Sequence, residues 1–224
     1  MKVRLISKST SPETLEFEGM KNAQDIVAYC ARVSNPSNQV NTETSERLIR
    51  YLVKHQHWSP LEMVNACLEI ETTRDIAHQI VRHRSFAFQE FSQRYANPEE
   101  QGDMFEYSEA RLQDTKNRQN SIETSDVELQ AWWDAQQKFV TEISKKIYDE
   151  ALKKGIAKEQ ARKVLPEGLT KTKLYMNGSL RSWIHYIELR SANGTQKEHM
   201  EIAHACAKVI AGIFPLMSEL QQGE

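Results

Sequence analysis

Residues 82–95 read Arg82-His83-Arg84-Ser85-Phe86-Ala87-Phe88-Gln89-Glu90-Phe91-Ser92-Gln93-Arg94-Tyr95 and hold three guanidiniums, an imidazole and a carboxylate. Arginine offers planar, paired donors that suit phosphate. Phe86, Phe88 and Phe91 are interleaved with polar residues, which is typical of an extended segment with one packed face and one face along a cleft. A plain solvated basic face would lack this pattern. We interpret the segment as an anion site with a polar recognition edge.

The same residues resemble the signature of the flavin-dependent thymidylate synthases, which is Arg-His-Arg, seven residues and Ser, usually continued as Glu-x-Ser-x-Arg. Arg82, His83, Arg84, Glu90, Ser92 and Arg94 all match, and Ala87 and Gln89 stand where many members carry Ser and Asn. Further matches extend the resemblance from about residue 34 to about residue 190. The resemblance implies an enzyme that makes dTMP from dUMP, with 5,10-methylenetetrahydrofolate as carbon donor and FAD, reduced by NADPH, as hydride donor.

The resemblance also implies roles for individual residues. The implied dUMP contacts are Gln79, Arg82, Glu90, Ser92, Gln93, Arg94, Arg162 and Arg190. The implied FAD contacts are Ser34, Ser59, Glu62, Arg82, His83, Arg84, Gln89, Glu90, Ser179, Arg181 and His185, with His57 lining the same site. Arg190 is implied as the catalytic residue, because the matching arginine is thought to polarise the uracil ring. A homotetramer with sites shared between subunits is implied as well.

Composition limits the class of protein. The 224 residues, 39% hydrophobic and 27% charged, are expected to form one domain over residues 1–224. The formal charge of -2 argues against a protein that coats nucleic acid, which needs an excess of basic surface. The first residues lack the apolar stretch of a signal peptide, and no run approaches the roughly 18 apolar residues of a membrane span. We therefore expect a cytoplasmic protein without membrane contact.

The residues that could carry other chemistry are few. Cys30, Cys67 and Cys206 are widely spaced and odd in number, so we expect packing residues and no cysteine nucleophile for attack on a pyrimidine. The histidines lack the spacing of helical zinc sites, and we expect no metal. Ser92 lacks an evident base, so we assign it to nucleotide binding. Neither Gly-x-Gly-x-x-Gly nor a Walker loop is present, so no Rossmann or P-loop mode is indicated.

Hydrophobic periodicity predicts the elements. Strands or extended pieces are expected over 3–6, 63–71 and 172–176. Helices are expected over 22–33, 44–56, 73–84, 125–154, 158–165 and 178–190, the last one capped by Asn177. A capping box of Thr195 and Glu198 should begin a final helix, with His199 and His204 on its surface. The expected fold is α+β, a small, mainly antiparallel sheet flanked by several long helices.

Residues 95–123 should hold little regular structure. Two alternatives stay open, one for the role of the helix that follows and one for the function. That helix has Leu129, Trp132, Val140, Ile143 and Ile147 near heptad spacing, a seam that suits either an internal core or a subunit contact. The alternative function is a non-catalytic nucleic-acid- or nucleotide-phosphate-binding module, in which residues 82–95 grip phosphates and the phenylalanines stack on bases.

Overall fold

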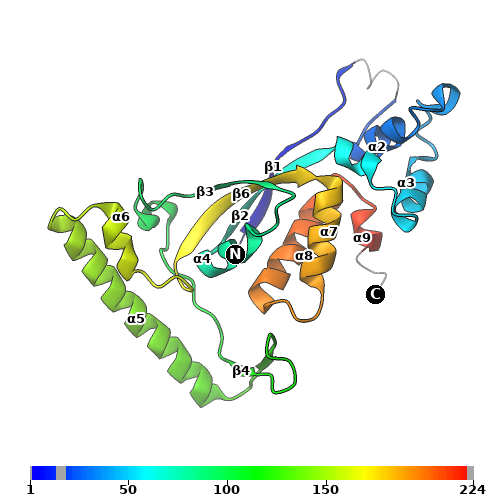
Figure 1. Ribbon diagram of the computed structural model, residues 1–224. Helices are drawn as coiled ribbons and strands as arrows, with labels where there is room; N and C mark the ends of the chain where they lie inside the picture. The colour runs from blue at the N-terminus through cyan, green and yellow to red at the C-terminus, as the bar shows by residue number, and fades with distance from the viewer. Residues whose placement is uncertain (1, 14–18, 221–224) are drawn as a thin grey trace.

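The computed structural model describes residues 2–13 and 19–220, with a curved sheet through the middle of the molecule (Figure 1). The strands are β1 (Lys2–Lys8), β2 (Asn65–Thr73), β3 (Ala87–Glu90), β4 (Arg111–Gln113), β5 (Ser121–Glu123) and β6 (Lys171–Ser179). The α-helices are α2 (Ala23–Ala31), α3 (Ser45–Lys54), α4 (Arg74–Ile80), α5 (Val127–Lys153), α6 (Lys158–Ala161), α7 (Leu180–Ser191), α8 (Lys197–Ala211) and α9 (Met217–Leu220). Short 3-10 helices are η1 (Pro36–Asn38), η2 (Ser59–Met63), η3 (Pro98–Gln101) and η4 (Arg162–Val164).

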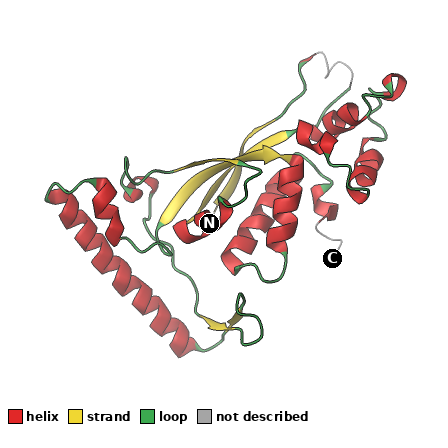
Figure 2. Ribbon diagram, viewed as in Figure 1, coloured by secondary structure: helices red, strands yellow, loops and turns green. Residues whose placement is uncertain are grey.

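The main sheet has the strand order β1-β2-β6-β3, and all its neighbouring strands are antiparallel. β4 and β5 form a separate small hairpin. Figure 2 shows the helices around this sheet, with α2 and α3 near one end and α5 and α6 near the other. The expected α+β fold is therefore confirmed.

β2 follows the alternation that the sequence predicted. Ala66, Leu68 and Ile70 are at most 1% exposed, and they lie on the face that α4 and α8 cover. The strand pairs with β6 along its whole length, from Asn65 opposite Ser179 to Thr73 opposite Lys171. This long pairing fixes where β6 ends and where α7 can begin.

α7 is anchored by its apolar side. Leu180, Trp183, Ile184 and Ile187 recur at helical spacing and are at most 2% exposed. The Trp183 indole Nε1 donates a hydrogen bond of 3.0 Å to the Ala66 carbonyl oxygen. Each large apolar side chain buried in this way contributes about 1.5–3 kcal/mol. α7 is thus held firmly against β6 and α8, and its other side is left for polar residues.

The start of α7 differs from the prediction of a helix capped by Asn177. Asn177 pairs with neighbouring strands on both sides, which extends β6 beyond residue 176. Ser179 is the N-cap instead, and its hydroxyl oxygen accepts from the Ser182 backbone N–H at 3.3 Å. Strand pairing, which is a tertiary effect, therefore decided the boundary.

The glycine in this last part of β6 has a packing role. A Cβ added to Gly178 would collide with the ring of Phe86. Phe86 is 9% exposed, and its ring lies edge-on to Trp183 with centroids 4.8 Å apart. The aromatic residues of the Arg-His-Arg segment thus fasten that segment to the core.

Two helix boundaries near the motif also differ from the predictions. α4 ends at Ile80, not at residue 84, because the His83 backbone N–H bonds to the Ile80 carbonyl in a tight turn that leads to β3. α8 begins after Gln196 without a side-chain cap, so the capping box of Thr195 and Glu198 is wrong. The Glu198 carboxylate instead accepts from Arg111 at 2.6 Å.

Residues 95–123 have little regular structure beyond η3 and the β4–β5 hairpin, as predicted. Ion pairs hold this hairpin against the start of α8. Lys197 Nζ lies 2.6 Å from Glu109 and 2.5 Å from Glu123. These ion pairs attach the β4–β5 hairpin to the body of the molecule.

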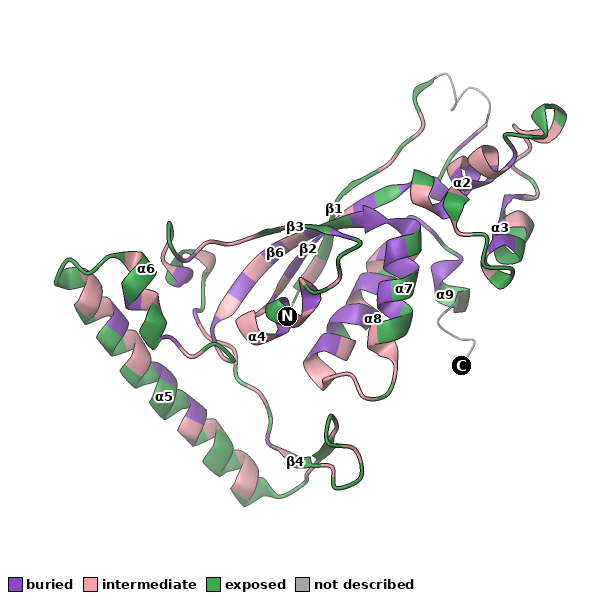
Figure 3. Cartoon of the chain, viewed as in Figure 1, coloured by how far each residue is buried: buried purple, intermediate pink, exposed green. Residues whose placement is uncertain are grey.

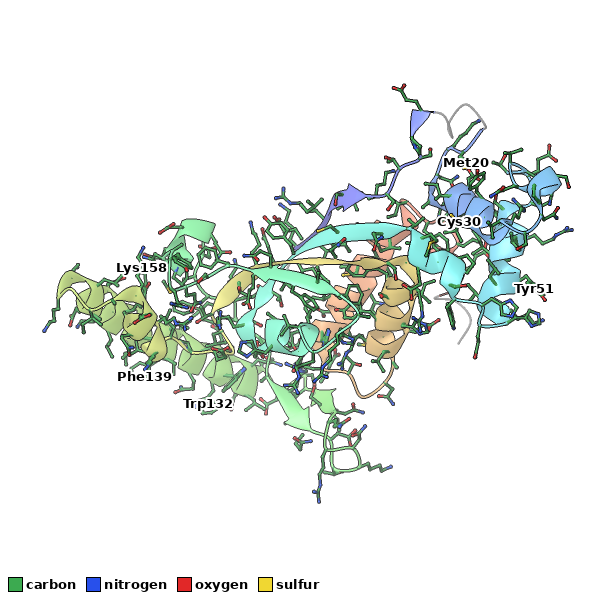
Figure 4. All side chains as sticks on the ribbon, turned by 45° about the horizontal axis from the view of Figure 1, so that its top comes forward. Met20, Cys30, Tyr51, Trp132, Phe139 and Lys158 are labelled. Atoms are coloured by element: carbon green, nitrogen blue, oxygen red, sulfur yellow. The ribbon has the colours of Figure 1, made fainter. Side chains whose placement is uncertain are left out.

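α5 lies apart from the sheet, with α6 beside it (Figures 1 and 3). A small core of Met104, Tyr148, Ala161 and Leu165 joins the two helices to the loop before β4. The heptad-like seam faces away from this core, since Trp132 is 56% exposed and Ile147 is 47% exposed. Figure 4 shows Trp132 and Phe139 along the helix. Within this chain the seam is not an internal core.

Two further expectations concern the whole chain. Among the described residues, no helix is both long and apolar enough to cross a membrane. Within the same ranges, no group of three or more histidine, cysteine or acidic side chains is placed to hold a metal ion.

Candidate active site

The Arg82-His83-Arg84 turn follows α4 and leads into β3. Its backbone is tightened by hydrogen bonds from Arg82 N–H to the Gln79 carbonyl and from His83 N–H to the Ile80 carbonyl. Arg82 and Arg84 are exposed, whereas His83 is half-buried. The turn therefore offers two guanidiniums to a ligand and directs the imidazole between them inward.

His83 is paired with the predicted catalytic residue. Arg190, at the end of α7, donates from Nε to His83 Nε2 at 2.9 Å. Burial, together with the charge of Arg190, lowers the pKa of His83 to about 4. His83 is consequently neutral at physiological pH and carries its proton on Nδ1. This hydrogen bond joins residues 107 positions apart in the sequence, with the cationic Arg190 as donor and the neutral His83 as acceptor.

A buried hydrogen-bond chain lies behind this pair. His199 Nε2 is 3.1 Å from the Tyr186 hydroxyl, and His199 Nδ1 is 3.2 Å from Gln79 Oε1. Gln79 Nε2 in turn donates to Gln196 Oε1 at 2.7 Å. Gln79 was predicted as a nucleotide contact, whereas the other three residues were not predicted as part of the site.

The prediction that His199 lies on the surface is wrong, because its side chain is 0% exposed. His204, expected there as well, is exposed. Helical spacing carried the missing signal. His199 precedes the buried Ile202 and Ala203 by three and four positions and so shares their face of α8. Burial, the charge of Arg190 and the neighbouring His83 lower the pKa of His199 to about 3.

A second polar group joins η2 to the start of α7. The Ser179 hydroxyl donates to Glu62 at 2.5 Å, and Arg181 Nη1 donates to the other carboxylate oxygen at 2.6 Å. These two hydrogen bonds, that from Ser179 first, hold the pKa of Glu62 below its usual value. Three predicted flavin residues are therefore in direct contact.

His185 lies one turn after Arg181 on the exposed side of α7. Its ring packs against Trp58 with centroids 4.5 Å apart, and Trp58 directly precedes Ser59, the first residue of η2. His57, one residue earlier, is exposed. Trp58 was missed by the sequence reasoning, although an aromatic residue beside a predicted flavin contact was a usable signal.

Ser34 lines an open cavity of about 540 Å³ between the end of α2 and α3. Arg32 and Arg47 line the same cavity. Arg32 is 7% exposed and donates to the Asn41 carbonyl and to the Thr44 hydroxyl, so it is held in place. η2 packs against both α2 and α7, which connects this cavity to the group around Glu62.

β3 is an edge strand of the sheet and carries the middle of the motif. Gln89 is exposed, whereas Glu90 is half-buried. Glu90 Oε1 accepts from the Thr172 hydroxyl at 2.9 Å and from Arg74 Nη1 at 3.3 Å. Arg74, the first residue of α4, is a neighbour of the motif that the sequence reasoning missed, because the contact joins residues 16 positions apart.

The last part of the motif lies beside α6. The Tyr95 carbonyl accepts from Lys158 Nζ at 3.0 Å, and Arg94 lies 3.8 Å from Glu159 with its side chain 57% exposed. Gln93 is 3% exposed, and its Nε2 has no hydrogen-bond partner within the described part of the chain. Ser92 is half-buried, as is Arg162 at the start of η4.

The predicted residues thus form two sets. One set comes from α7 and its N-cap, from η2 and from α4 with the turn after it, with Ser34 at the cavity between α2 and α3: Ser34, Ser59, Glu62, Gln79, Arg82, His83, Arg84, Ser179, Arg181, His185 and Arg190. The other set is Ser92, Gln93, Arg94 and Arg162, beside α6. β3, with Gln89 and Glu90, runs from the first set to the second (Figure 1). Its four residues span about 13 Å along the edge of the sheet.

Comparisons with known proteins show what this chain is similar to. Residues 17–216 match the family model Thy1, described as thymidylate synthase complementing protein. The flavin-dependent thymidylate synthase of Synechocystis is 49% identical over 218 residues, covering 97% of this chain and 98% of the relative. The probable flavin-dependent thymidylate synthase of Paramecium bursaria Chlorella virus 1 is 48% identical over 202 residues, covering 90% and 92%.

A solved structure shares the fold. It is the UMP/dUMP methylase PolB from Streptomyces cacaoi bound with 5-Br dUMP, and the TM-score is 0.76. The match covers 98% of this chain and 93% of that chain at 24% sequence identity.

Proposed function

This chain belongs to the Thy1 family, the flavin-dependent thymidylate synthases, and we propose that it converts dUMP to dTMP by methylation at C5. The one-carbon unit comes from 5,10-methylenetetrahydrofolate, and the reducing equivalents come from NADPH through bound FAD. The reaction is placed in the cytoplasm, which stays a prediction from the sequence.

The observation that carries the proposal is the Arg190–His83 pair. A carboxylate beside Arg190 would cancel its charge, whereas the neutral imidazole of His83 holds the guanidinium without neutralising it. A cation placed beside the uracil ring favours the anionic form of the ring and raises the electron density at C5. Arg190 can therefore prepare C5 to attack the one-carbon unit.

The cysteines support a route without a protein thiol. Cys206 is 0% exposed, and Cys30 and Cys67 are partly buried. Burial raises the pKa of all three thiols above the usual value, which lowers the fraction of reactive thiolate. Thymidylate synthesis on this chain therefore depends on ring polarisation by Arg190 and not on addition of a thiol to the ring.

The chemistry of the residues around α7 fits a flavin dinucleotide. Ser34, Arg32 and Arg47 supply donors and positive charge for phosphate at the α2–α3 cavity. Arg181 and His185 are exposed, and Glu62 holds Arg181 in a fixed orientation. The FAD contacts proposed in the same region are Ser59, Arg82, His83, Arg84, Gln89, Glu90 and Ser179. FAD, when bound, supplies the hydride.

The proposed dUMP contacts combine cations with hydrogen-bonding groups. They are Gln79, Arg82, Glu90, Ser92, Gln93, Arg94, Arg162 and Arg190. Gln93 is buried with an unpartnered Nε2, which is a donor left for a ligand. Arg94 is bound only loosely to Glu159 and can turn toward phosphate.

We further propose a homotetramer in which neighbouring subunits share each site. The exposed seam on α5 supports a subunit contact, since Trp132, Phe139, Val140, Ile143 and Ile147 are each more than 40% exposed. Contiguous apolar surface of this kind marks interaction sites. A neighbouring copy could bring its residues 92–94 to the α7 set of this chain and thereby complete the site.

The test is a set of measurements on the purified protein. An absorbance spectrum should show bound flavin, and NADPH oxidation should depend on dUMP. With 5,10-methylenetetrahydrofolate present, dUMP labelled with tritium at C5 should release its label while dTMP forms. A flavin-loaded protein that makes no dTMP with all substrates present would overturn the proposal. A colourless protein with strongly salt-dependent binding of single-stranded nucleic acid would favour the binding module instead.

A further inference from the structure

Behind Gln79, a proposed dUMP contact, the buried Tyr186 and His199 and the half-buried Gln196 have no part in the reaction described above. His199 is 0% exposed and Tyr186 is 1% exposed, so water does not satisfy their polar atoms. Both ring nitrogens of His199 have partners, 3.1 Å and 3.2 Å away. Polar groups this deeply buried need a hydrogen-bond partner for each donor and acceptor. The fold therefore decides which atom donates and which accepts in each bond.

Two directions are chemically consistent for the His199 ring. In the first, the Tyr186 hydroxyl donates to His199 Nε2, and His199 Nδ1–H donates to Gln79 Oε1. In the second, every bond is reversed, and the buried Tyr186 hydroxyl hydrogen needs another acceptor. The only partner that the structure gives this hydroxyl, within the described residues, is His199. The first direction therefore leaves no buried hydrogen unpaired.

This direction decides what Gln79 can offer to a ligand. Its Oε1 accepts from His199, and its Nε2 donates one hydrogen to Gln196 at 2.7 Å. The second hydrogen on Nε2 remains. Gln79 is half-buried and one turn before Arg82, so it borders the exposed motif. An N–H group suits the carbonyl or phosphate oxygens of a nucleotide, whereas a reversed amide would present an oxygen to them.

We propose that His199 is a positioning residue which, with Tyr186, fixes the side-chain amide of Gln79 as a hydrogen-bond donor toward the nucleotide. The inference rests on the proposed function through the role of Gln79 in dUMP binding. The surroundings favour the neutral ring that this task requires, because a charged His199 would face Arg190 and His83 in a buried site. A side-chain amide that is ordered before binding loses less rotamer entropy when the ligand arrives.

Three variants separate the hydrogen bonds of the chain. His199→Phe removes both ring nitrogens while it keeps a flat side chain. His199→Asn keeps a donor at the position of Nδ1 and therefore the contact with Gln79. Tyr186→Phe keeps the imidazole but removes the group that sets its tautomer. The matched controls are His204→Phe, on the exposed side of α8, and Tyr148→Phe, a buried tyrosine whose hydroxyl lacks a partner among the described residues.

The readouts are the dUMP dissociation constant from calorimetry, flavin content, and kcat and KM for dUMP. His199→Phe should weaken dUMP binding by about tenfold, with flavin retained. The Gln79 side chain would no longer be ordered before binding and would lose its rotamer entropy when dUMP binds. His199→Asn should recover most of the affinity, Tyr186→Phe should lose about threefold, and the controls should bind as the wild type does. A folded, flavin-loaded His199→Phe that binds dUMP as tightly as the wild type would overturn the proposal. A Tyr186→Phe loss without recovery in His199→Asn would overturn it as well.

A second readout is independent of the proposed function. Nitrogen-15 spectra of labelled histidines distinguish a proton on Nδ1 from one on Nε2, and the His199→Asn spectrum assigns the His199 signal. The proposal expects the Nδ1–H form in the wild type and a mixture in Tyr186→Phe. An Nε2–H or doubly protonated His199 at neutral pH would overturn it. Failure of the wild type to bind dUMP would instead overturn the proposed function.

Discussion

α7 and α5 both carry large apolar residues at helical spacing, but the two helices bury them to very different extents. On α7, Trp183 and Ile187 are at most 2% exposed, and they pack against the sheet and α8. On α5, Trp132 and Ile147 are 56% and 47% exposed. Both helices show apolar residues at helical spacing in the sequence. The pattern therefore identifies an apolar face but not the surface that packs against it.

The difference separates two tasks within one chain. The region around α7 is closely packed within this chain, and it holds the Arg190–His83 pair and the Glu62 group in fixed geometry. The region around α5 and α6 has only a small core, and it holds the exposed Arg94 and the half-buried Arg162. In the proposed function the first region prepares the chemistry, and a neighbouring subunit completes the second.

The largest expected effect is on stability. Trp183→Ala should lower the free energy of unfolding by about 3–5 kcal/mol, because it leaves a cavity and removes the hydrogen bond from the indole to the Ala66 carbonyl. Trp132→Ala on the exposed seam should change the stability of the dissociated chain by no more than about 0.5 kcal/mol. Urea unfolding at low protein concentration measures both. Equal losses would mean that α5 is part of the same core.

The next effect is on catalysis. Arg190→Ala should lower kcat for dTMP formation by about 10²-fold or more, because a charge that acts on the developing anion is lost. Arg190→Lys should also be poor, since a lysine does not reproduce the planar fork that donates to His83. Flavin content serves as the control for folding. Turnover within a few-fold of the wild type would refute the role given to Arg190.

Assembly should respond to charge on the seam. The double variant Ile143→Glu and Ile147→Glu should dissociate the proposed tetramer, since carboxylates resist burial in an apolar contact. Ala131→Glu provides a control, because it adds a carboxylate at an exposed position on another side of α5. Light scattering after size exclusion reports the mass. An intact tetramer in the double variant would place the subunit contact elsewhere.

The last effect is a dependence of stability on pH, which is spread over several pH units. The pKa of His199 is about 3 in the folded protein and near 6.5 when unfolded, so the unfolded state takes up the proton first as pH falls. Stability should therefore fall with decreasing pH from about 6.5, by up to about 1.4 kcal/mol per pH unit, with His83 adding to the slope. His199→Asn should flatten the slope above pH 4.5 and His204→Asn should not. An unchanged slope in His199→Asn would contradict the folded-state value.

The sequence predicted the elements whose pattern is local. The alternation in β2 and the apolar face of α7 both follow from residues next to each other in the chain. The sequence pattern did not predict which strands pair over long range. Asn177 looked like a helix cap, but the strands on either side of it extend β6 through that position.

The candidate site shows the same division between local patterns, which the sequence predicted, and long-range contacts, which it did not. The motif identified Arg82, His83 and Arg84, whereas the contact from Arg190 to His83 joins residues 107 positions apart and exists only in the fold. His199 was assigned to the surface because histidine is polar, although its helical position matched the buried face of α8. Polarity outweighed periodicity in that prediction, and periodicity was the better guide.

The most direct test of the central claim, that the α7 region of one subunit is completed by residues 92–94 of another, is complementation between inactive variants. Arg82→Ala and Arg94→Ala chains are unfolded, mixed in equal amounts and refolded together. Random assembly should restore about a quarter of the sites and a corresponding share of dTMP formation, because one in four sites receives both intact halves. A mixture of Arg82→Ala with Arg84→Ala, both in the same half, should stay inactive. Mixed oligomers of Arg82→Ala and Arg94→Ala that recover no activity would show that each chain builds its site alone.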